Sequence, residues 1–248
     1  MDNQRNDFTY RLLLDGGIKK GMRVLDVGCG TGDVSMMVAE LVGESGEAIG
    51  FDISESAVAI AQGVAQQNQL TNIKFIISDI TELPYDLGQF DAIVGRRVLM
   101  YQKDAVSSVK SLLSFLKPDG LLIFQESDCM GTPNNIKSMP LHCQVQSWIW
   151  KTVAKEGGNI HIGSELYSIM KQAGLNICQI RAEAIVQTQE SGSDLAWVTE
   201  MMLIRITKLG VASEEEIDID TLDERLQNEI KESNSVFIRD MAFGVWAK

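Results

Sequence analysis

The chain has 248 residues, of which 45% are hydrophobic and 23% charged, and its formal net charge is −12. These proportions are those of an ordinary globular protein, and the length suffices to bury a sizeable core in one large domain or two small ones. No basic patch stands out, although neutralising phosphates normally needs one, so a nucleic-acid partner is not expected. The longest apolar runs fall far below the ~20 residues of a membrane-spanning helix.

The negative charge is concentrated near the C-terminus. Residues 212–232 contain nine acidic residues and two basic ones, so this stretch carries −7 of the total. Acidic runs of this kind are typical of a solvated helix and the loop before it.

The cysteines and the N-terminus indicate a reducing compartment. The four cysteines (Cys29, Cys129, Cys143, Cys178) are scattered without CxxC spacing, which argues against a disulfide framework and against a zinc site. No metal is therefore expected. Residues 1–10 are polar and lack the apolar core of a secretion signal, so we expect a cytoplasmic protein.

Strand and helix patterns alternate through the first half of the chain. A helix with an apolar side is predicted over residues 8–19, and a turn at 117–120 closes the last helix of this half. Such alternation is typical of parallel strands with right-handed crossovers, hence of a doubly wound α/β sheet. Strands are predicted at 22–28, 47–52, 73–78, 90–95 and 120–126, and helices at about 33–42, 54–68 and 104–117.

The alternation breaks after residue 126. The later patterns predict a long amphipathic helix around 145–153, helices at 163–174, 193–210 and 221–232, and strands at 175–188 and 236–246. The last strand has no crossover helix long enough for a simple parallel return, which favours antiparallel insertion beside the previous strand. We expect one domain, with a core of about 8–128, 163–190 and 235–248 and helical insertions at about 129–162 and 192–232.

A glycine loop follows the first strand. Gly28, Gly30 and Gly32 stand at alternate positions, and a helical pattern begins at Asp33. Glycine allows a ligand to approach the backbone closely, and the free N–H groups of a helix start favour polar or negative groups. A dinucleotide fold needs its third glycine where this chain has Asp33, so a ligand without pyrophosphate suits this loop better.

Acidic residues follow the next two strands. Asp52 comes twenty residues after Gly32, a spacing at which a carboxylate can accept hydrogen bonds from ribose hydroxyls. Asp79, followed by Ile80, can hold an adenine amino group while the isoleucine packs on the ring. Asp52 as a helix N-cap and Asp79 as a turn residue before Thr81 remain alternatives, and Ser54 can serve as the cap instead.

These motifs, in this order, resemble those of class I S-adenosylmethionine-dependent methyltransferases. Residues 24–32 (Val-Leu-Asp-Val-Gly-Cys-Gly-Thr-Gly) look like the first motif, and Asp52 and Asp79 match the ribose-binding and adenine-contacting acids. Residues 90–94 resemble the fourth motif, and 116–120 the turn before the fifth strand. The resemblance covers about 8–128 and is greatest to small-molecule enzymes of the ubiquinone/menaquinone type.

The resemblance implies a Rossmann-like seven-stranded sheet with an antiparallel last strand. It also implies S-adenosylmethionine as cofactor and a small-molecule acceptor, with no nucleic acid and no membrane span. The oligomeric state stays open. The cofactor contacts that it implies are Tyr10, Arg11, Gly28, Gly30, Gly32, Asp52, Ile53, Asp79, Ile80, Arg96 and Tyr101.

No catalytic side chain can be assigned from the sequence. The sulfonium cofactor carries the activation, so the protein mainly aligns the acceptor and excludes water. His142, His161 and Glu126 are weak candidates for a general base or an orienting acid. Trp148, Trp150 and Trp197 lie in the insertions, which we expect to form a cap over an aromatic acceptor pocket.

The leading hypothesis is methyl transfer to an O, N or C nucleophile of a small, partly apolar molecule. One alternative is an S-adenosylmethionine-binding protein with a non-methylating role. A nucleic-acid methyltransferase is disfavoured because residues 95–98 read Gly-Arg-Arg-Val, where base amino-methylating enzymes have an Asn/Asp-Pro-Pro-aromatic run. An NAD-dependent oxidoreductase is the remaining alternative.

Overall fold

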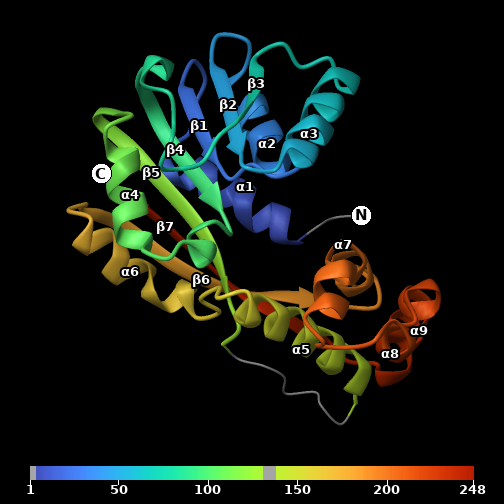
Figure 1. Ribbon diagram of the computed structural model, residues 1–248. Helices are drawn as coiled ribbons and strands as arrows, with labels where there is room; N and C mark the ends of the chain where they lie inside the picture. The colour runs from blue at the N-terminus through green and yellow to red at the C-terminus, as the bar shows by residue number, and fades with distance from the viewer. Residues whose placement is uncertain (1–3, 131–137) are drawn as a thin grey trace. The chain divides into compact units, whose positions relative to one another are not determined.

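The structure, a computed structural model, describes residues 4–130 and 138–248 (Figure 1). Residues 131–137 of the predicted first insertion lie outside the described part. Within that part the strands form one seven-stranded sheet in the order β3-β2-β1-β4-β5-β7-β6. The strands are β1 (Arg23–Val27), β2 (Glu47–Asp52), β3 (Ile73–Ile77), β4 (Phe90–Arg96), β5 (Leu116–Asp128), β6 (Ile177–Gln187) and β7 (Phe237–Ala247).

The sheet is mixed. β1 pairs in parallel with both β2 and β4, with Asp26 opposite Gly50 on one side and Val94 on the other. At the other edge, the backbone groups of Asn176 and Lys248 exchange two hydrogen bonds of 2.6 and 2.9 Å. These residues precede β6 and follow β7, and such a reciprocal pair is the mark of antiparallel strands. The predicted doubly wound sheet with an antiparallel last strand is confirmed.

Helices connect the strands as the apolar spacing predicts. α2 buries Val34, Val38 and Val42, which recur at helical spacing, and it contacts β1 and β2. α3 lies against β2 and β3, while α4 contacts α6 (Figure 1). The helices are α1 (Gln4–Gly16), α2 (Asp33–Val42), α3 (Glu55–Gln67), α4 (Ala105–Leu113), α5 (Pro140–Lys155), α6 (Ile162–Gln172), α7 (Leu195–Lys208), α8 (Glu214–Ile217) and α9 (Ile219–Ser233), with the short 3₁₀ turns η1 (Tyr85–Leu87) and η2 (Leu99–Tyr101).

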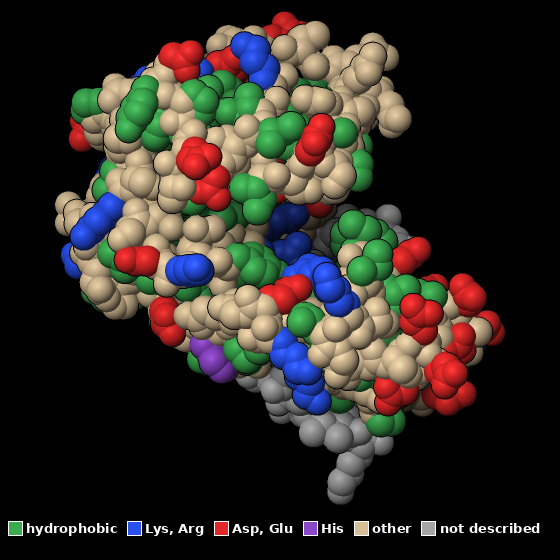
Figure 2. Space-filling view, viewed as in Figure 1, with side chains coloured by type: hydrophobic (Ala, Val, Ile, Leu, Met, Phe, Trp, Pro, Cys, Tyr) green, Lys and Arg blue, Asp and Glu red, His purple; other side chains and the backbone are tan. Residues whose placement is uncertain are grey.

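Two compact units divide the chain. The core unit consists of Asp7–Glu126, Ile162–Ala182 and Phe243–Lys248. The helical unit contains residues 4–6 and the described residues of 127–161 and 183–242, and within it α5 contacts α7 and α9. Figure 2 shows acidic side chains gathered over α8 and α9, the acidic stretch of the sequence. The assignment of a single domain with two insertions stays a prediction.

The clearest boundary differences concern the first helix, α4 and β5. The first helix spans Gln4–Gly16 rather than 8–19, and α4 ends at Leu113 rather than at 117. β5 begins at Leu116, and the predicted turn at 117–120 is a bulge within this strand, because Leu116 pairs with Phe90 and Leu121 with Ala92. The bulge accommodates Pro118, which cannot donate a ladder hydrogen bond.

No helix within residues 4–130 and 138–248 has the length and hydropathy that crossing a membrane would require.

Candidate functional site

A cavity of about 250 Å³ lies where β1, β2, β3 and β4 end. Ligands of open α/β sheets bind beyond the carboxyl ends of the strands, and this is that edge. Six of the residues predicted to contact the cofactor line it: Gly28, Asp52, Ile53, Asp79, Ile80 and Tyr101. A larger hollow of about 670 Å³, lined by Lys19, Lys117 and Trp246, lies at the opposite strand ends and lacks the glycine loop and the two carboxylates.

The glycine loop has left-handed backbone at each glycine. Gly28, Gly30 and Gly32 have φ values of 61°, 54° and 92°, a region that favours glycine. A Cβ at Gly28 would lie 2.7 Å from a methyl group of Val98, which lines the same cavity. A Cβ at Gly30 would meet nothing within 4 Å. Gly28 is thus required by close packing as well as by its backbone.

Asp52 connects the glycine loop to the end of β2. Its Oδ2 accepts a hydrogen bond of 2.9 Å from the Gly30 N–H, and its Oδ1 accepts one of 2.9 Å from the Ser54 N–H. Ser54 is the N-cap of α3, as its side chain accepts from the Ala57 N–H. Asp52 is therefore not the cap of α3, and its carboxylate lines the cavity.

Asp79 lies at the end of β3 and has a structural role as well. Its Oδ1 accepts hydrogen bonds from the N–H and the hydroxyl of Thr81, at 2.8 and 2.6 Å. These bonds lower the pKa of Asp79, so the group is an anionic acceptor at neutral pH. Asp79 is therefore the turn residue before Thr81 and also lines the cavity.

Apolar side chains flank the two acids. Ile53 is 71% exposed and follows Asp52 directly, whereas Ile80 is buried. Tyr101, from η2, is also exposed. A cavity with two carboxylates and apolar walls fits an adenosine, whose ribose and amino groups donate hydrogen bonds and whose ring is flat and apolar on both faces.

Asp26 lies in β1 directly before the glycine loop. Its side chain is buried, and burial raises its pKa to about 7, although the Ser35 hydroxyl donates to it. Burial also raises the pKa of the Cys29 thiol, so this loop cysteine stays protonated at neutral pH. The Cys29 thiol therefore does not serve as an ionised nucleophile near neutral pH, whereas the Asp26 carboxyl is partly ionised there.

Five predicted contacts do not line the cavity: Gly30 and Gly32 of the glycine loop, and Arg96, Arg11 and Tyr10. Arg96, at the end of β4, donates to the Thr9 hydroxyl at 3.3 Å and to Asp33 at 3.2 Å, and so joins α1 to the start of α2. Arg11 forms an ion pair of 2.9 Å with Asp7 along α1. Tyr10 lies half-buried on the same helix. Their assignment as cofactor contacts stays a prediction.

Of the cavity wall that follows β4, only Tyr101 was predicted. Arg97, Val98 and Gln102 line the cavity, and Arg97 has the unusual φ of 57°. Two arginines after a glycine at the end of a strand are a signal of this edge, but sequence alone does not show which of them faces the ligand. The predicted cofactor contact was the neighbouring Arg96, which does not line the cavity.

Glu126, a weak catalytic candidate, lies at the end of β5 and is buried. Its Oε1 accepts hydrogen bonds from the N–H groups of Val98 and Leu99 at 3.0 and 2.8 Å. Burial raises its pKa to about 7 against the effect of these bonds. Glu126 thereby fixes the backbone of the segment that lines the cavity.

The histidines lie in the helical unit. His142 is fully buried in α5, where its Nδ1 lies 2.6 Å from a carboxylate oxygen of Glu229 and its ring contacts Phe237. Burial lowers its pKa, which keeps the ring neutral at neutral pH. His161 lies beside Asp128 and Cys129. Together these three residues are the only group of possible metal ligands found in the described part of the chain.

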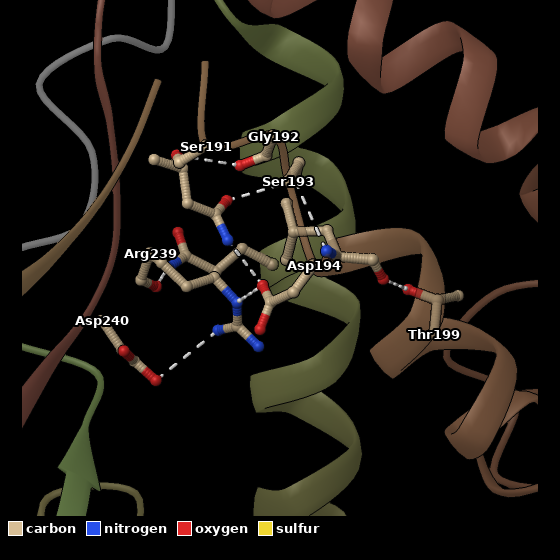
Figure 3. Close-up of polar contacts among 10 residues, drawn as sticks. Ser191, Gly192, Ser193, Asp194, Thr199, Arg239 and Asp240 are labelled. Atoms are coloured by element: carbon tan, nitrogen blue, oxygen red, sulfur yellow. Dashed lines mark hydrogen bonds and ion pairs between the residues drawn. The ribbon is translucent and has the colours of Figure 1, made fainter. Parts of the chain in front are cut away.

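A buried arginine organises the polar contacts of the helical unit. Arg239 donates to Asp194 at 3.0 Å and lies 3.7 Å from Asp240 (Figure 3). Gln187 donates to Asp194 at 2.6 Å, and the Ser193 hydroxyl donates to Gln187. The two carboxylates raise the pKa of Arg239 against the effect of burial.

Trp148 and Trp150 are buried, whereas Trp197 is exposed.

Comparison with known proteins gives the family. Residues 18–174 match the model of a methyltransferase domain. The chain is similar to a protein of Staphylococcus aureus (strain MRSA252) named demethylmenaquinone methyltransferase, with 30% identity over 174 residues that cover 70% of this chain and 68% of that relative.

Solved structures agree at the level of the fold. A putative methyltransferase from Bacillus halodurans superposes with a TM-score of 0.64 and 15% identity, covering 97% of this chain and 98% of that one. Coclaurine N-methyltransferase, bound to N-methylheliamine and SAH, superposes with a TM-score of 0.62 and 14% identity, covering 98% of this chain and 72% of that one. The chain belongs to the methyltransferase domain family, and its methyl donor is S-adenosylmethionine.

Proposed function

We propose that this methyltransferase transfers the methyl group to a ring carbon or a hydroxyl oxygen of a small, partly apolar molecule of the quinol or phenol class. The single observation that carries the proposal is the relative named demethylmenaquinone methyltransferase, whose similarity covers about two thirds of its length. Its name describes a quinone acceptor that carries an apolar chain. We place the enzyme in the cytoplasm and expect no nucleic-acid partner, as the sequence analysis indicates.

The proposed cofactor contacts follow from the cavity. The Asp52 carboxylate accepts from the ribose hydroxyls, and Asp79 accepts from the adenine amino group. Ile53 and Ile80 pack on the two sides of the base. The backbone of Gly28 lies against the cofactor, and a side chain there would collide with Val98. These roles are supported by the position of all five residues on one cavity.

The chemistry demands little from the protein beyond alignment. Bound S-adenosylmethionine supplies an activated methyl group for in-line displacement. The residues of this chain orient the acceptor and exclude water, and a base is needed only if the acceptor must lose a proton. Glu126 supports the site through the backbone of Val98 and Leu99.

The test is turnover with a defined acceptor. The purified chain is incubated with S-adenosylmethionine and either reduced demethylmenaquinone or a short-chain naphthoquinol, and S-adenosylhomocysteine and the methylated product are followed by mass spectrometry. Formation of both supports the proposal. Duplex DNA and transfer RNA are tested in parallel. Methylation of either nucleic acid without methylation of a quinol would contradict the proposal.

A second measurement, of S-adenosylmethionine binding, distinguishes methyl transfer from a non-methylating role. If S-adenosylmethionine binds while quinols, phenols and small amines all yield no S-adenosylhomocysteine, the chain uses the cofactor for another purpose. The proposed acceptor class is then wrong, although the cofactor contacts stand.

A further inference from the structure

We propose that Asp128, Cys129 and His161 bind one Zn²⁺ ion. The sequence argued against zinc, because no two cysteines stand at metal-binding spacing. The fold nevertheless brings together three different donor types, a carboxylate, a thiol and an imidazole, whose ligand atoms all lie within 4.8 Å of one another.

The separations of His161 Nδ1 from the other two donor atoms are those of a common ligand shell. Zinc binds sulfur at about 2.3 Å and nitrogen or carboxylate oxygen at about 2.0–2.2 Å, so a tetrahedral ion separates its nitrogen from its sulfur by about 3.5 Å and from its oxygen by about 3.4 Å. Here Nδ1 of His161 lies 3.5 Å from Sγ of Cys129 and 3.4 Å from Oδ1 of Asp128.

The backbone holds the three residues in place. Asp128 ends β5 and Cys129 follows it, and the Cys129 N–H donates to the carbonyl of Ile160, directly before His161, at 3.0 Å. Asp128 is fully buried, and its Oδ1 also accepts from the Met130 N–H at 2.8 Å. Second-shell bonds of this kind orient the carboxylate of a metal site.

The imidazole must rotate to direct a nitrogen lone pair at the ion. Sγ of Cys129 lies 3.5 Å from Nδ1 and 3.7 Å from Nε2 of His161, so the sulfur lies over the face of the ring rather than along a nitrogen lone pair. The His161 side chain is 58% exposed, so rotating the ring about its Cβ–Cγ bond disturbs little packing. Nδ1 is the ring nitrogen nearer to the Cys129 sulfur, and it lies 3.4 Å from Oδ1 of Asp128.

The donor set selects the metal and its coordination. Thiolate and imidazole favour zinc over magnesium or calcium, which prefer oxygen ligands. On binding, the Cys129 thiol loses its proton to solvent and the sulfur donates its electron pair to the ion. Three protein ligands leave the fourth tetrahedral position for water or for a donor atom of a small molecule.

The test uses the full chain freed of metal by a chelator. Zn²⁺ is titrated against a competing chromophoric chelator, and Co²⁺ serves as a spectroscopic substitute whose thiolate charge-transfer band reports sulfur ligation. We expect one ion per chain and a sulfur-to-cobalt band in the near ultraviolet. Cys129→Ser abolishes the band, and both Cys129→Ser and His161→Gln weaken Zn²⁺ binding by about tenfold or more.

Cys178→Ser is the matched control, because Cys178 is an exposed free cysteine on β6. It retains the band and the affinity. Circular dichroism of the metal-free variants verifies that they fold, and exposed His161 provides a variant with little risk to the core. A band that survives Cys129→Ser, or zinc affinity unchanged by both substitutions, overturns the proposal. The result is independent of methyl transfer, since no cofactor or acceptor is present.

Discussion

Gly28 and Gly30 share a left-handed backbone but differ in their surroundings, which makes them a matched pair. Both substitutions to alanine carry the strain of a positive φ, about 1 kcal/mol. Only the new methyl group at residue 28 collides with Val98, at 2.7 Å. We expect Gly28→Ala to weaken S-adenosylmethionine binding by about tenfold more than Gly30→Ala, measured by calorimetry on samples whose folding is verified by urea denaturation.

A second substitution tests the cause. Val98→Ala removes both methyl groups that the new side chain meets. The double variant Gly28→Ala/Val98→Ala should therefore bind more tightly than Gly28→Ala alone, a coupling of neighbouring sites. Equal affinities for Gly28→Ala and Gly30→Ala would show that backbone strain, not the collision, governs this loop.

Asp52 has a role that separates it from other acids of the core unit. Loss of its carboxylate removes the proposed acceptor for the ribose and leaves the Gly30 N–H without its partner. Asp52→Ala should weaken S-adenosylmethionine binding by about 1–3 kcal/mol, the usual cost of a lost charged hydrogen-bonding partner. Calorimetric titration measures this, with Asp86→Ala in η1 as the control. Unchanged affinity in Asp52→Ala would refute the ribose assignment.

The residues at the strand ends show how far sequence reasoning reaches at this scale. The positions of Asp52 and Asp79 at the cavity could be predicted, because each ends a strand pattern and Asp52 also stands twenty residues after Gly32. The contact between Gly28 and Val98 could not, since it depends on the pairing of Val27 with Gly95 and on the backbone after β4. The grouping of Asp128, Cys129 and His161 likewise depends on a long-range contact, the hydrogen bond from the Cys129 N–H to the carbonyl of residue 160.

At the scale of elements, Glu126 connects β5 to the segment that precedes η2. Its pKa is raised from 4.5 to about 7, so between these values the folded protein binds more protons than the unfolded chain. The contribution of this group to the free energy of unfolding therefore falls as pH rises from about 4.5 to about 7. Glu126→Gln removes that contribution, and the difference in stability between pH 5 and pH 8 becomes smaller.

Urea denaturation at the two pH values measures the effect. Asp26, whose pKa is also raised to about 7, acts in the same direction from β1. Asp26→Asn should reduce the same difference, and the two substitutions should add unless the groups are coupled. A pH dependence that stays the same in both variants would mean that neither carboxyl is buried as an acid.

The elements themselves could largely be predicted, and the failures have a physical cause. Alternation and helical spacing fix strands and helices whose faces are buried, as with Val34, Val38 and Val42 of α2. The segment 114–120 was misplaced because Pro118 and Gly120 are typical of a turn, whereas pairing with β4 keeps them in a bulged strand. Pairing is a long-range property that a local pattern does not contain.

For the whole molecule, cofactor binding should be visible as stability. At a concentration of S-adenosylmethionine of about 100 Kd, binding to the folded state alone adds about 2.7 kcal/mol. In a chain of this size that corresponds to an increase in Tm of about 5–10 °C. Since all the proposed contacts belong to the core unit, the transition of that unit should shift.

NADH is the matched control in this thermal titration, because it contains adenosine but also a pyrophosphate. Asp33 stands where a pyrophosphate-binding loop has its third glycine, so NADH should raise the Tm by much less than S-adenosylmethionine does. Asp52→Ala should reduce the shift produced by S-adenosylmethionine at the same concentration, since its Kd is higher. A larger shift with NADH would indicate that the loop accepts a dinucleotide, and the cavity contacts assigned to adenosine would then have to be reassigned.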